Sequence, residues 1–254
     1  EDFSGLGVER DVVVTEGTGK AYARYVAFTH RKSSEKDIYF VSNQLATDRL
    51  LDFNFRITNR IPVIYDASSN NTIKVNSWSS ANGRTNMTLK LAPNQSLFIL
   101  FDGPAKSARS NSGNNWINFK AAQDLSKDWQ VKFDSSYGGP SKPVVFNELQ
   151  DWTKRADTLL KYYSGTAIYS KTFNYTQNIE GKIWIDLGEF SSIASVKLNG
   201  IDCGTLWTAP HRLEVSKALR KGENQITIEI TNTWGNRLIG DSKLPVDKRI
   251  TNTT

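Results

Sequence analysis

The chain has 254 residues, a length that suits two domains of about 100–150 residues each. Hydrophobic residues make up 38% of it and include 12 Phe, 9 Tyr and 7 Trp, which is enough apolar material for two packed cores and excludes a disordered chain. The formal net charge is +6, but Lys and Arg are scattered among Thr, Ser, Asn and Asp, a pattern that favours solvated strand faces and predicts no nucleic-acid partner.

Apolar and polar side chains alternate with a period of two through the first hundred residues, which predicts half-buried strands. In residues 51–57, for example, Leu, Phe, Phe and Ile alternate with Asp, Asn and Arg. Asn82-Gly83 suits a two-residue hairpin turn, because both residue types accept positive φ. We expect strands at 21–29, 37–43, 51–57, 61–65, 72–78, 84–91 and 96–101. So many short strands predict an antiparallel, immunoglobulin-like sandwich over residues 1–104.

A stretch without large apolar residues follows, and we expect residues 105–114 to be a linker. Alternation then resumes, most strictly at Ile226, Ile228 and Ile230. We expect strands at 129–133, 165–173, 181–187, 195–199, 212–215 and 224–231, with one short helix near 216–220. Because no helical period of a barrel or a dinucleotide-binding unit is present, the fold class is all-β, with a second antiparallel sandwich over residues 115–254.

The sequence has few residues that are suited to metal binding or redox chemistry. Cys203 is the single cysteine, so no internal disulfide is possible, and we expect it in a hairpin turn. One cysteine and two histidines, His30 and His211, argue against a zinc site, so we predict no cofactor; a calcium ion held by oxygen ligands stays open. No apolar run is long enough to cross a membrane, and no signal peptide opens the chain. Because the chain begins at Glu1 without Met, we expect the natural polypeptide to be longer.

Two stretches of the second half carry a recognisable pattern. Residues 161–173 read KYYSGTAIYSKTF, and residues 196–224 contain VKLNG, then GTLW, PHR and LRKGEN. Together they resemble the sugar-binding, galactose-binding-like jelly roll of glycoside hydrolase family 2. The resemblance implies that residues 115–254 form such a jelly roll.

A further ordered set of motifs resembles the C-terminal region of glycoside hydrolase family 106, the α-L-rhamnosidase-like proteins. It comprises WQVKFDSSYGGP at 129–140, DW at 151–152, NTWGNRLIGD at 232–241 and, in the first half, FTHR at 28–31 with DIYFVSN at 37–43. The resemblance implies that the family's catalytic barrel lies before Glu1. It also implies a bacterial protein that is secreted, periplasmic or on the cell surface.

Hydrolysis of a glycoside normally takes two carboxyl groups that flank the bond, one of them with a raised pKa. Asp151 and Asp157 share a polar stretch and are the best pair that the sequence offers. Turn capping or an ion pair explains them at least as well. We therefore predict no catalytic residues in this chain, with this pair as the remaining candidates.

Carbohydrate binding needs flat aromatic surface and planar polar groups, which jelly rolls display on loops at one end or on a concave face. The candidates are Trp152, Arg155, Tyr162, Tyr163, Trp207 and Arg237. The alternative for each aromatic residue is core packing or a module interface. Trp234, near Arg237, could line a sugar pocket or dock a preceding domain, and we favour docking.

Three functions are consistent with these observations. The first is a non-catalytic accessory region that braces the preceding catalytic domain of the same polypeptide and contacts a rhamnose- or galactose-containing glycan. The second is an independent carbohydrate-binding module. The third is a small glycosidase with its own carboxylate pair, Asp151 and Asp157. We favour the first, because it accounts for the whole ordered set of motifs.

Overall fold

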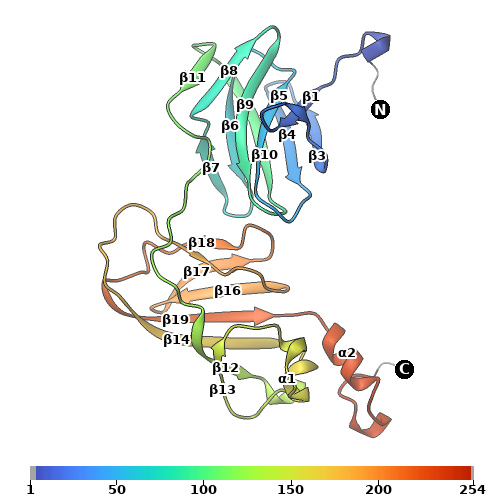
Figure 1. Cartoon of the computed structure of the whole chain (residues 1–254), viewed down its shortest axis with the longest axis vertical. Helices are drawn as coiled ribbons and strands as arrows, with labels where there is room; N and C mark the ends of the chain where they lie inside the picture. The colour runs from blue at the N-terminus through green and yellow to red at the C-terminus, as the bar shows by residue number, and fades with distance from the viewer. Residues whose placement is uncertain (1–3, 253–254) are drawn as a thin grey trace. The chain divides into compact units, whose positions relative to one another are not determined.

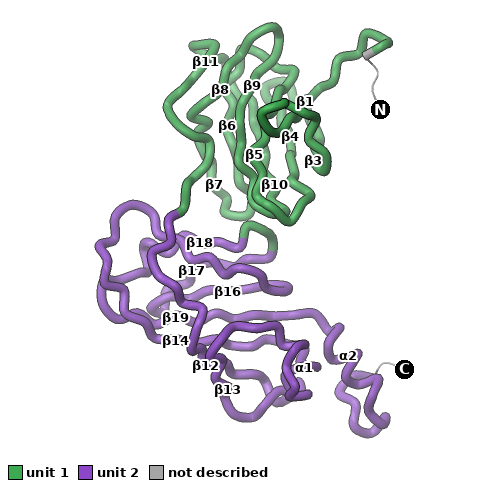
Figure 2. The backbone as a smooth tube through the Cα atoms, in the orientation of Figure 1, with its two compact units in different colours: residues 1–119, 208–210 green, residues 120–207, 211–254 purple. Residues whose placement is uncertain are grey.

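The computed structural model describes residues 4–252, which form mostly antiparallel strands in two compact bodies (Figure 1). Unit 1 comprises residues 1–119 with the short segment 208–210, and unit 2 comprises residues 120–207 and 211–254 (Figure 2). The predicted all-β class with two sandwich-like bodies is confirmed. No helix within residues 4–252 is long and apolar enough to span a membrane.

Unit 1 is built from a six-stranded and a five-stranded antiparallel sheet. Its elements are η1 (Ser4–Leu6), β1 (Val12–Glu16), β2 (Ala21–Tyr22), β3 (Val26–Lys32), β4 (Lys36–Asn43), β5 (Arg49–Phe55), β6 (Arg60–Asp66), β7 (Asn71–Lys74), β8 (Ser77–Ala81), β9 (Arg84–Leu91), β10 (Ser96–Pro104) and β11 (Arg109–Asn111). The strand orders are β11-β8-β9-β5-β1-β2 and β3-β4-β10-β6-β7. The predicted strand 72–78 is two strands, β7 and β8, which belong to different sheets.

The core of unit 1 follows the period of two. Every second residue of β4 from Asp37 to Asn43 is buried, as the alternation predicts. Tyr39, Phe55 and Phe101 are fully buried and pack edge to face, with ring centroids 4.8 Å apart for Tyr39 and Phe55. Each such side chain contributes about 1.5–3 kcal/mol through burial of apolar surface, so this cluster is a main source of stability.

Unit 1 extends past the predicted boundary at residue 104. Inside the predicted linker, β11 pairs with β8, and beyond it the buried Asn115 holds the chain. Asn115 Oδ1 accepts from the backbone N–H groups of Asn76 and Ser77 (2.8 Å each), and its Nδ2 donates to the Thr88 carbonyl oxygen (2.9 Å). An edge strand pairs through its backbone alone, so β11 needs no large apolar side chain. The division between the two units falls after Phe119.

Unit 2 is built around one six-stranded sheet of order β13-β12-β14-β19-β16-β17, with a two-stranded sheet of β15 and β18. Its elements are β12 (Lys127–Phe133), η2 (Ser135–Tyr137), β13 (Val144–Glu148), η3 (Trp152–Lys154), α1 (Thr158–Lys161), β14 (Thr166–Tyr175), β15 (Trp184–Asp186), β16 (Ile193–Leu198), β17 (Ile201–Leu206), β18 (Arg212–Glu214), β19 (Gly222–Thr231), α2 (Gly235–Asp241) and η4 (Val246–Lys248). The central strands β14 and β19 pair over ten residues each and carry the core.

Two local predictions for unit 2 are wrong. The predicted helix near 216–220 is a single turn, in which the N–H groups of Ala218 and Leu219 both donate to the Val215 carbonyl oxygen (2.9 Å each). Cys203 lies inside β17, because the tight turn before that strand already closes at Asn199-Gly200. Both turn residues have positive φ (54° and 79°), as a two-residue hairpin loop requires.

Candidate functional site

The strand order of unit 2 brings the ends of distant strands to one edge of its sheet. At this edge Thr231, at the end of β19, pairs with Thr166 at the start of β14 and with Ile193 at the start of β16. Strand β12 is antiparallel to β14, and β17 is antiparallel to β16. Strands β12, β17 and β19 therefore all run toward this edge, where β19 leads into α2 (Figure 1).

An exposed aromatic residue follows each of these three strands within a few positions. Tyr137, Trp207 and Trp234 expose 43%, 68% and 51% of their surface, and we call this set the aromatic edge. Tyr137 and Trp234 form an edge-to-face pair with ring centroids 6.0 Å apart. Large aromatic side chains so exposed contribute little to folding, and the contact between Tyr137 and Trp234 makes a continuous exposed aromatic surface, which is typical of a binding surface. Trp207 lies at the same edge, after a strand that β16 separates from β19.

Arg237 anchors the segment that carries Trp234. This arginine is buried, and its guanidinium donates to the Tyr162 carbonyl oxygen from Nε (3.0 Å) and from Nη2 (2.7 Å). Its backbone N–H donates to Ser164 Oγ (2.9 Å). The guanidinium also lies 2.9 Å from where a Cβ of Gly138 would be, and Gly138 has φ of 77°, so only glycine fits beside it. The loops at this edge are thus tied together by buried polar contacts.

Asp241 continues this anchor toward the C-terminus. Its Oδ2 accepts from the backbone N–H groups of Ile250 (3.0 Å) and Thr251 (2.7 Å), and its Oδ1 lies 3.7 Å from Arg237 Nη1. Burial alone raises the pKa of this carboxyl, but the hydrogen bonds from Thr251 and the charge of Arg237 outweigh burial and bring the pKa below its ordinary value. Asp241 is therefore held in the ionised form that its partners require.

Three of the predicted sugar-binding residues are instead part of the interior. Trp152 packs edge to face on Phe133 and Tyr163, and its indole N–H donates to the Tyr169 hydroxyl (2.7 Å). Tyr163 is fully buried. The prediction that these two rings contact a sugar is wrong, because neither has a free face, and core packing holds instead. The prediction is also wrong for Arg237, whose buried guanidinium serves the loops.

Arg155, Tyr162 and Trp207 keep at least part of their surface accessible. The Arg155 guanidinium lies 4.7 Å from the ring centre of the buried Phe146, a cation–π contact. The Tyr162 hydroxyl accepts from Lys243 Nζ (2.7 Å), a hydrogen bond that lowers the pKa of Tyr162. The interpretation of these three as sugar-contacting residues stays a prediction, and Trp207 is the one that belongs to the aromatic edge.

Asp151 and Asp157 both cap short helices. Asp151 Oδ1 accepts from the Thr153 backbone N–H (2.9 Å) and hydroxyl (2.8 Å), and Asp157 Oδ1 accepts from the Leu159 backbone N–H (2.9 Å). The bonds from Thr153 lower the pKa of Asp151, whereas a general acid needs a raised pKa. This geometry supports the capping alternative that the sequence left open.

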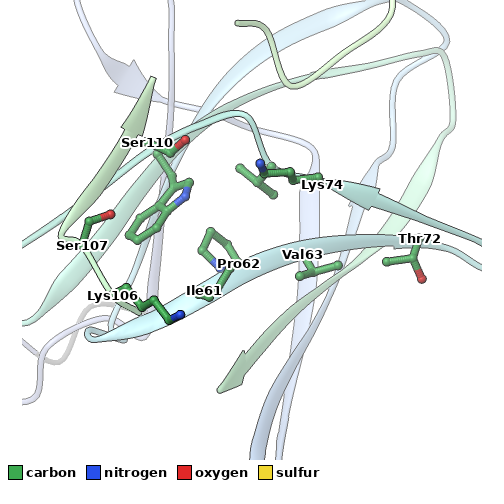
Figure 3. Close-up of a pocket in the computed structure, with 10 residues that line it drawn as sticks. Ile61, Pro62, Val63, Thr72, Lys74, Lys106, Ser107 and Ser110 are labelled. Carbon is green, nitrogen blue, oxygen red and sulfur yellow. The ribbon is translucent and has the colours of Figure 1, made fainter. Parts of the chain in front are cut away.

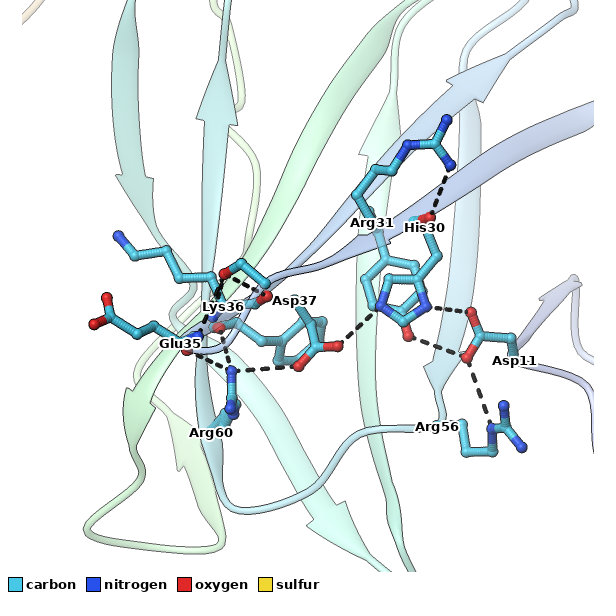
Figure 4. A network of polar contacts seen from close by, with 11 residues as sticks. Asp11, His30, Arg31, Glu35, Lys36, Asp37, Arg56 and Arg60 are labelled. Atoms are coloured by element: carbon cyan, nitrogen blue, oxygen red, sulfur yellow. Dashed lines mark hydrogen bonds and ion pairs between the residues drawn. The ribbon is translucent and has the colours of Figure 1, made fainter.

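A second polar cluster lies in unit 1 and surrounds His30 (Figure 4). Its Nδ1 is 2.8 Å from Asp11 Oδ2, its Nε2 is 3.0 Å from the buried Asp37, and its ring stacks on Tyr39 at 4.0 Å. Arg60 also lies 3.3 Å from Asp37. Both nitrogens of His30 are thus engaged, which supports a structural cross-link and argues against a free catalytic base.

Metal binding gains no support from the histidines and acidic residues. Within residues 4–252, no group of three or more His, Cys, Asp or Glu side chains could hold a metal ion. His211 Nδ1 lies 2.8 Å from the Gly188 carbonyl oxygen, a local contact in the loops of unit 2. A calcium ion held by oxygen ligands, which the sequence left open, is not tested by this geometry.

Comparison with known proteins agrees with both parts of the predicted resemblance. Residues 2–79 match the α-L-rhamnosidase family, glycoside hydrolase family 106, and residues 147–251 match the galactose-binding domain-like family of glycosyl hydrolase family 2. The solved rhamnosidase from Novosphingobium sp. PP1Y superposes with a TM-score of 0.82 and 31% identity over 98% of this chain and 23% of that chain.

A curated relative from Formosa agariphila, named "Putative beta-glucuronidase", is 44% identical over 126 residues, which cover 48% of this chain and 11% of the relative. The chain thus spans less than a quarter of the length of these two relatives. The chain is thus similar to a region of a rhamnosidase, with a segment that matches family 106 ahead of a segment that matches the family 2 galactose-binding-like domain.

Proposed function

We propose that this chain is the non-catalytic accessory region of a secreted bacterial α-L-rhamnosidase-like glycoside hydrolase, and that the aromatic edge of unit 2 contacts the saccharide. The observation that carries the proposal is the exposed pair of Tyr137 and Trp234, with Trp207 after a third strand that ends at the same edge of the galactose-binding-like domain. Aromatic faces stack on the C–H faces of sugar rings, and loops at the end of a jelly roll are a usual place for such contacts.

The buried anchor below the aromatic edge supports a binding role. Arg237 and Asp241 fix the segments around Trp234 before any ligand arrives, so less conformational entropy is lost on binding. The half-buried Tyr162, with Lys243 on its hydroxyl, adds polar groups near the same segment. A rigid aromatic surface beside polar side chains suits a neutral glycan with rhamnose or galactose units.

The accessory role is supported by the share of the rhamnosidase that this chain matches. The aligned region is 23% of that polypeptide, so the greater part of the relative lies outside it. We propose that unit 1 and unit 2 brace a preceding catalytic domain and deliver saccharide to it, in a protein located in the periplasm, on the cell surface or outside the cell. An independent binding module differs in one respect, since its affinity would not depend on the catalytic domain.

Titration of the 254-residue chain with rhamnose- and galactose-containing oligosaccharides, followed by calorimetry, tests the saccharide contact. Trp234→Ala and Trp207→Ala should each weaken binding by about two- to twelvefold, as the loss of one stacking contact of about 0.5–1.5 kcal/mol predicts. Tyr22→Ala is the matched control, because Tyr22 is 63% exposed but belongs to unit 1. A flat titration across all these sugars, or an equal loss in the control, would contradict the proposal.

Hydrolysis assays test the non-catalytic part. The isolated chain should not release aryl alcohol from aryl α-L-rhamnosides above the buffer rate, because its best carboxylate pair caps helices. A measurable rate that Asp151→Asn abolishes would assign catalysis to this chain and overturn the accessory role.

A further inference from the structure

A pocket of about 420 Å³ opens on unit 1, and no residue of the aromatic edge lines it (Figure 3). It lies between an edge strand of each sheet: β6 and the edge strand β7 of one, and β8 with the edge strand β11 of the other. Pro62 and Trp78 contribute apolar surface to it. Its volume falls within the range of about 300–1,000 Å³ that small-ligand sites occupy, so a short saccharide fits.

The pocket is cationic. Lys74 and Lys106 extend into it from opposite sides (Figure 3), and its ten lining residues, all within the described chain, include no Asp or Glu. Neither lysine forms an ion pair with another residue of 4–252. Other lysines of this unit are neutralised, such as Lys36 by Asp102 (2.9 Å) and Lys90 by Asp48 (3.0 Å). Two unneutralised ammonium groups that face one space favour an anionic ligand.

Hydroxyl groups and one indole add the hydrogen-bonding pattern of a polyol site. Ser107 Oγ donates to the Arg109 carbonyl oxygen (2.8 Å) and Ser110 Oγ to the Asn76 carbonyl oxygen (2.9 Å). With their protons engaged, both oxygens can still accept from hydroxyl groups of a ligand. Only 7% of Trp78 is exposed, and none of the hydrogen bonds within residues 4–252 uses its indole N–H. This donor remains for a ligand oxygen.

We propose that this pocket binds an acidic saccharide, a sugar unit that bears a carboxylate or a sulfate ester. The lysines take the negative group, the serine oxygens accept from ring hydroxyls, and Pro62 with Trp78 contacts the C–H face. The site is independent of the aromatic edge and does not rest on the function proposed for it. Because both lysines are exposed, binding should be weak and should fall as salt rises.

The test is an NMR titration of the ¹⁵N-labelled chain with three short oligosaccharides: one containing uronate, one sulfated, and a neutral one of equal length. The chain has 7 Trp, so the indole N–H peaks are few, and Trp78→Phe assigns the one from this pocket. The Trp78 peak should shift with an acidic oligosaccharide and stay in place with the neutral one. If only the uronate-containing or only the sulfated oligosaccharide binds, that result identifies the anionic group as a carboxylate or a sulfate ester.

A charge-matched pair of variants decides whether the lysines are responsible. Lys74→Ala with Lys106→Ala should raise the dissociation constant by about tenfold or more, since charge-assisted contacts are the stronger ones. Lys132→Ala with Lys197→Ala removes the same charge from exposed positions of unit 2 and should leave it unchanged. All four side chains are exposed, so neither variant should disturb folding.

Three results would overturn the proposal. The first is an unmoved Trp78 peak with every acidic oligosaccharide. The second is equal binding of inorganic sulfate alone, which would show an anion site without saccharide recognition. The third is loss of acidic-saccharide binding in Trp234→Ala and not in the lysine variant, which would place the ligand on the aromatic edge. The third result would leave the function proposed for that edge standing.

Discussion

Unit 1 and unit 2 both bury charged side chains, but they place them differently. In unit 1, His30 on β3 lies between Asp11 and Asp37, so the network joins strands inside the sandwich. In unit 2, Arg237 and Asp241 of α2 bind to connecting segments near Tyr162 and Thr251. The first arrangement links strands β3 and β4 to the residue that precedes β1 of the other sheet, whereas the second fixes loops. The comparison teaches that the segment around Trp234 is held in place by buried polar contacts of α2.

The largest expected effect follows from removal of the arginine that holds these loops. Arg237→Ala removes the cationic partner of the Asp241 carboxylate and both side-chain donors to the Tyr162 carbonyl oxygen, and loss of one member of a buried ion pair costs about 3–5 kcal/mol. Urea denaturation followed by tryptophan fluorescence measures the loss. Hydrogen exchange should localise it to α2 and the residues around 250.

Arg220→Ala is the control for this comparison, because Arg220 is exposed and should change stability by no more than about 0.5 kcal/mol. Arg237→Lys keeps the charge but not the forked donors, so it should recover only part of the stability. If Arg237→Ala were as stable as the control, the buried contacts would not fix the loops, and the contrast between the units would fail.

A smaller effect is expected for the cross-link of unit 1. His30→Gln removes the stacking on Tyr39 and weakens the contacts of the ring nitrogens with Asp11 and Asp37, which costs about 1–3 kcal/mol. Chemical denaturation of the single variants and of His30→Gln with Asp37→Asn gives their coupling free energy. The double variant should cost less than the sum of the two single ones. Strict additivity would show that His30 and Asp37 do not stabilise each other.

The strands of both units could be predicted because their signal is local. Alternation of apolar and polar residues predicts strand 84–91, and β9 spans the same residues. The same holds for the central strand β19, where Ile226 and Ile228 are buried on alternate positions. Strand β11 escaped prediction, because an edge strand of Arg, Ser and Asn pairs through its backbone and needs no apolar pattern.

The aromatic edge could be predicted only in part. The loop position of Trp207 makes it a candidate and Trp234 is a candidate for docking, but the turn position of Tyr137 carries no signal for binding. Their placement at one edge depends on β19 lying between β14 and β16, a long-range pairing that local patterns do not encode. For Trp152 the polar sequence around it predicts an exposed ring. The short helix η3 instead turns the ring onto Phe133, so the side chain is buried.

The smallest expected effect separates a capping carboxyl from a catalytic one in unit 2. Asp151→Ala removes the cap of η3 and should cost about 1 kcal/mol at pH 7. The backbone and side-chain hydrogen bonds from Thr153 lower the pKa of Asp151, so its contribution is complete above the unfolded carboxyl pKa of about 3.9 and is lost as the pH falls through the lower folded value. The stability difference between wild type and variant, measured by urea denaturation from pH 7 down to about pH 3, should therefore shrink in acid.

A general acid would have a raised pKa, and then the carboxyl would favour the folded state at low pH and lose that contribution as the pH rises through the folded value. Because the two roles give opposite slopes, a difference that grows in acid would exclude the cap and return Asp151 to the list of catalytic candidates.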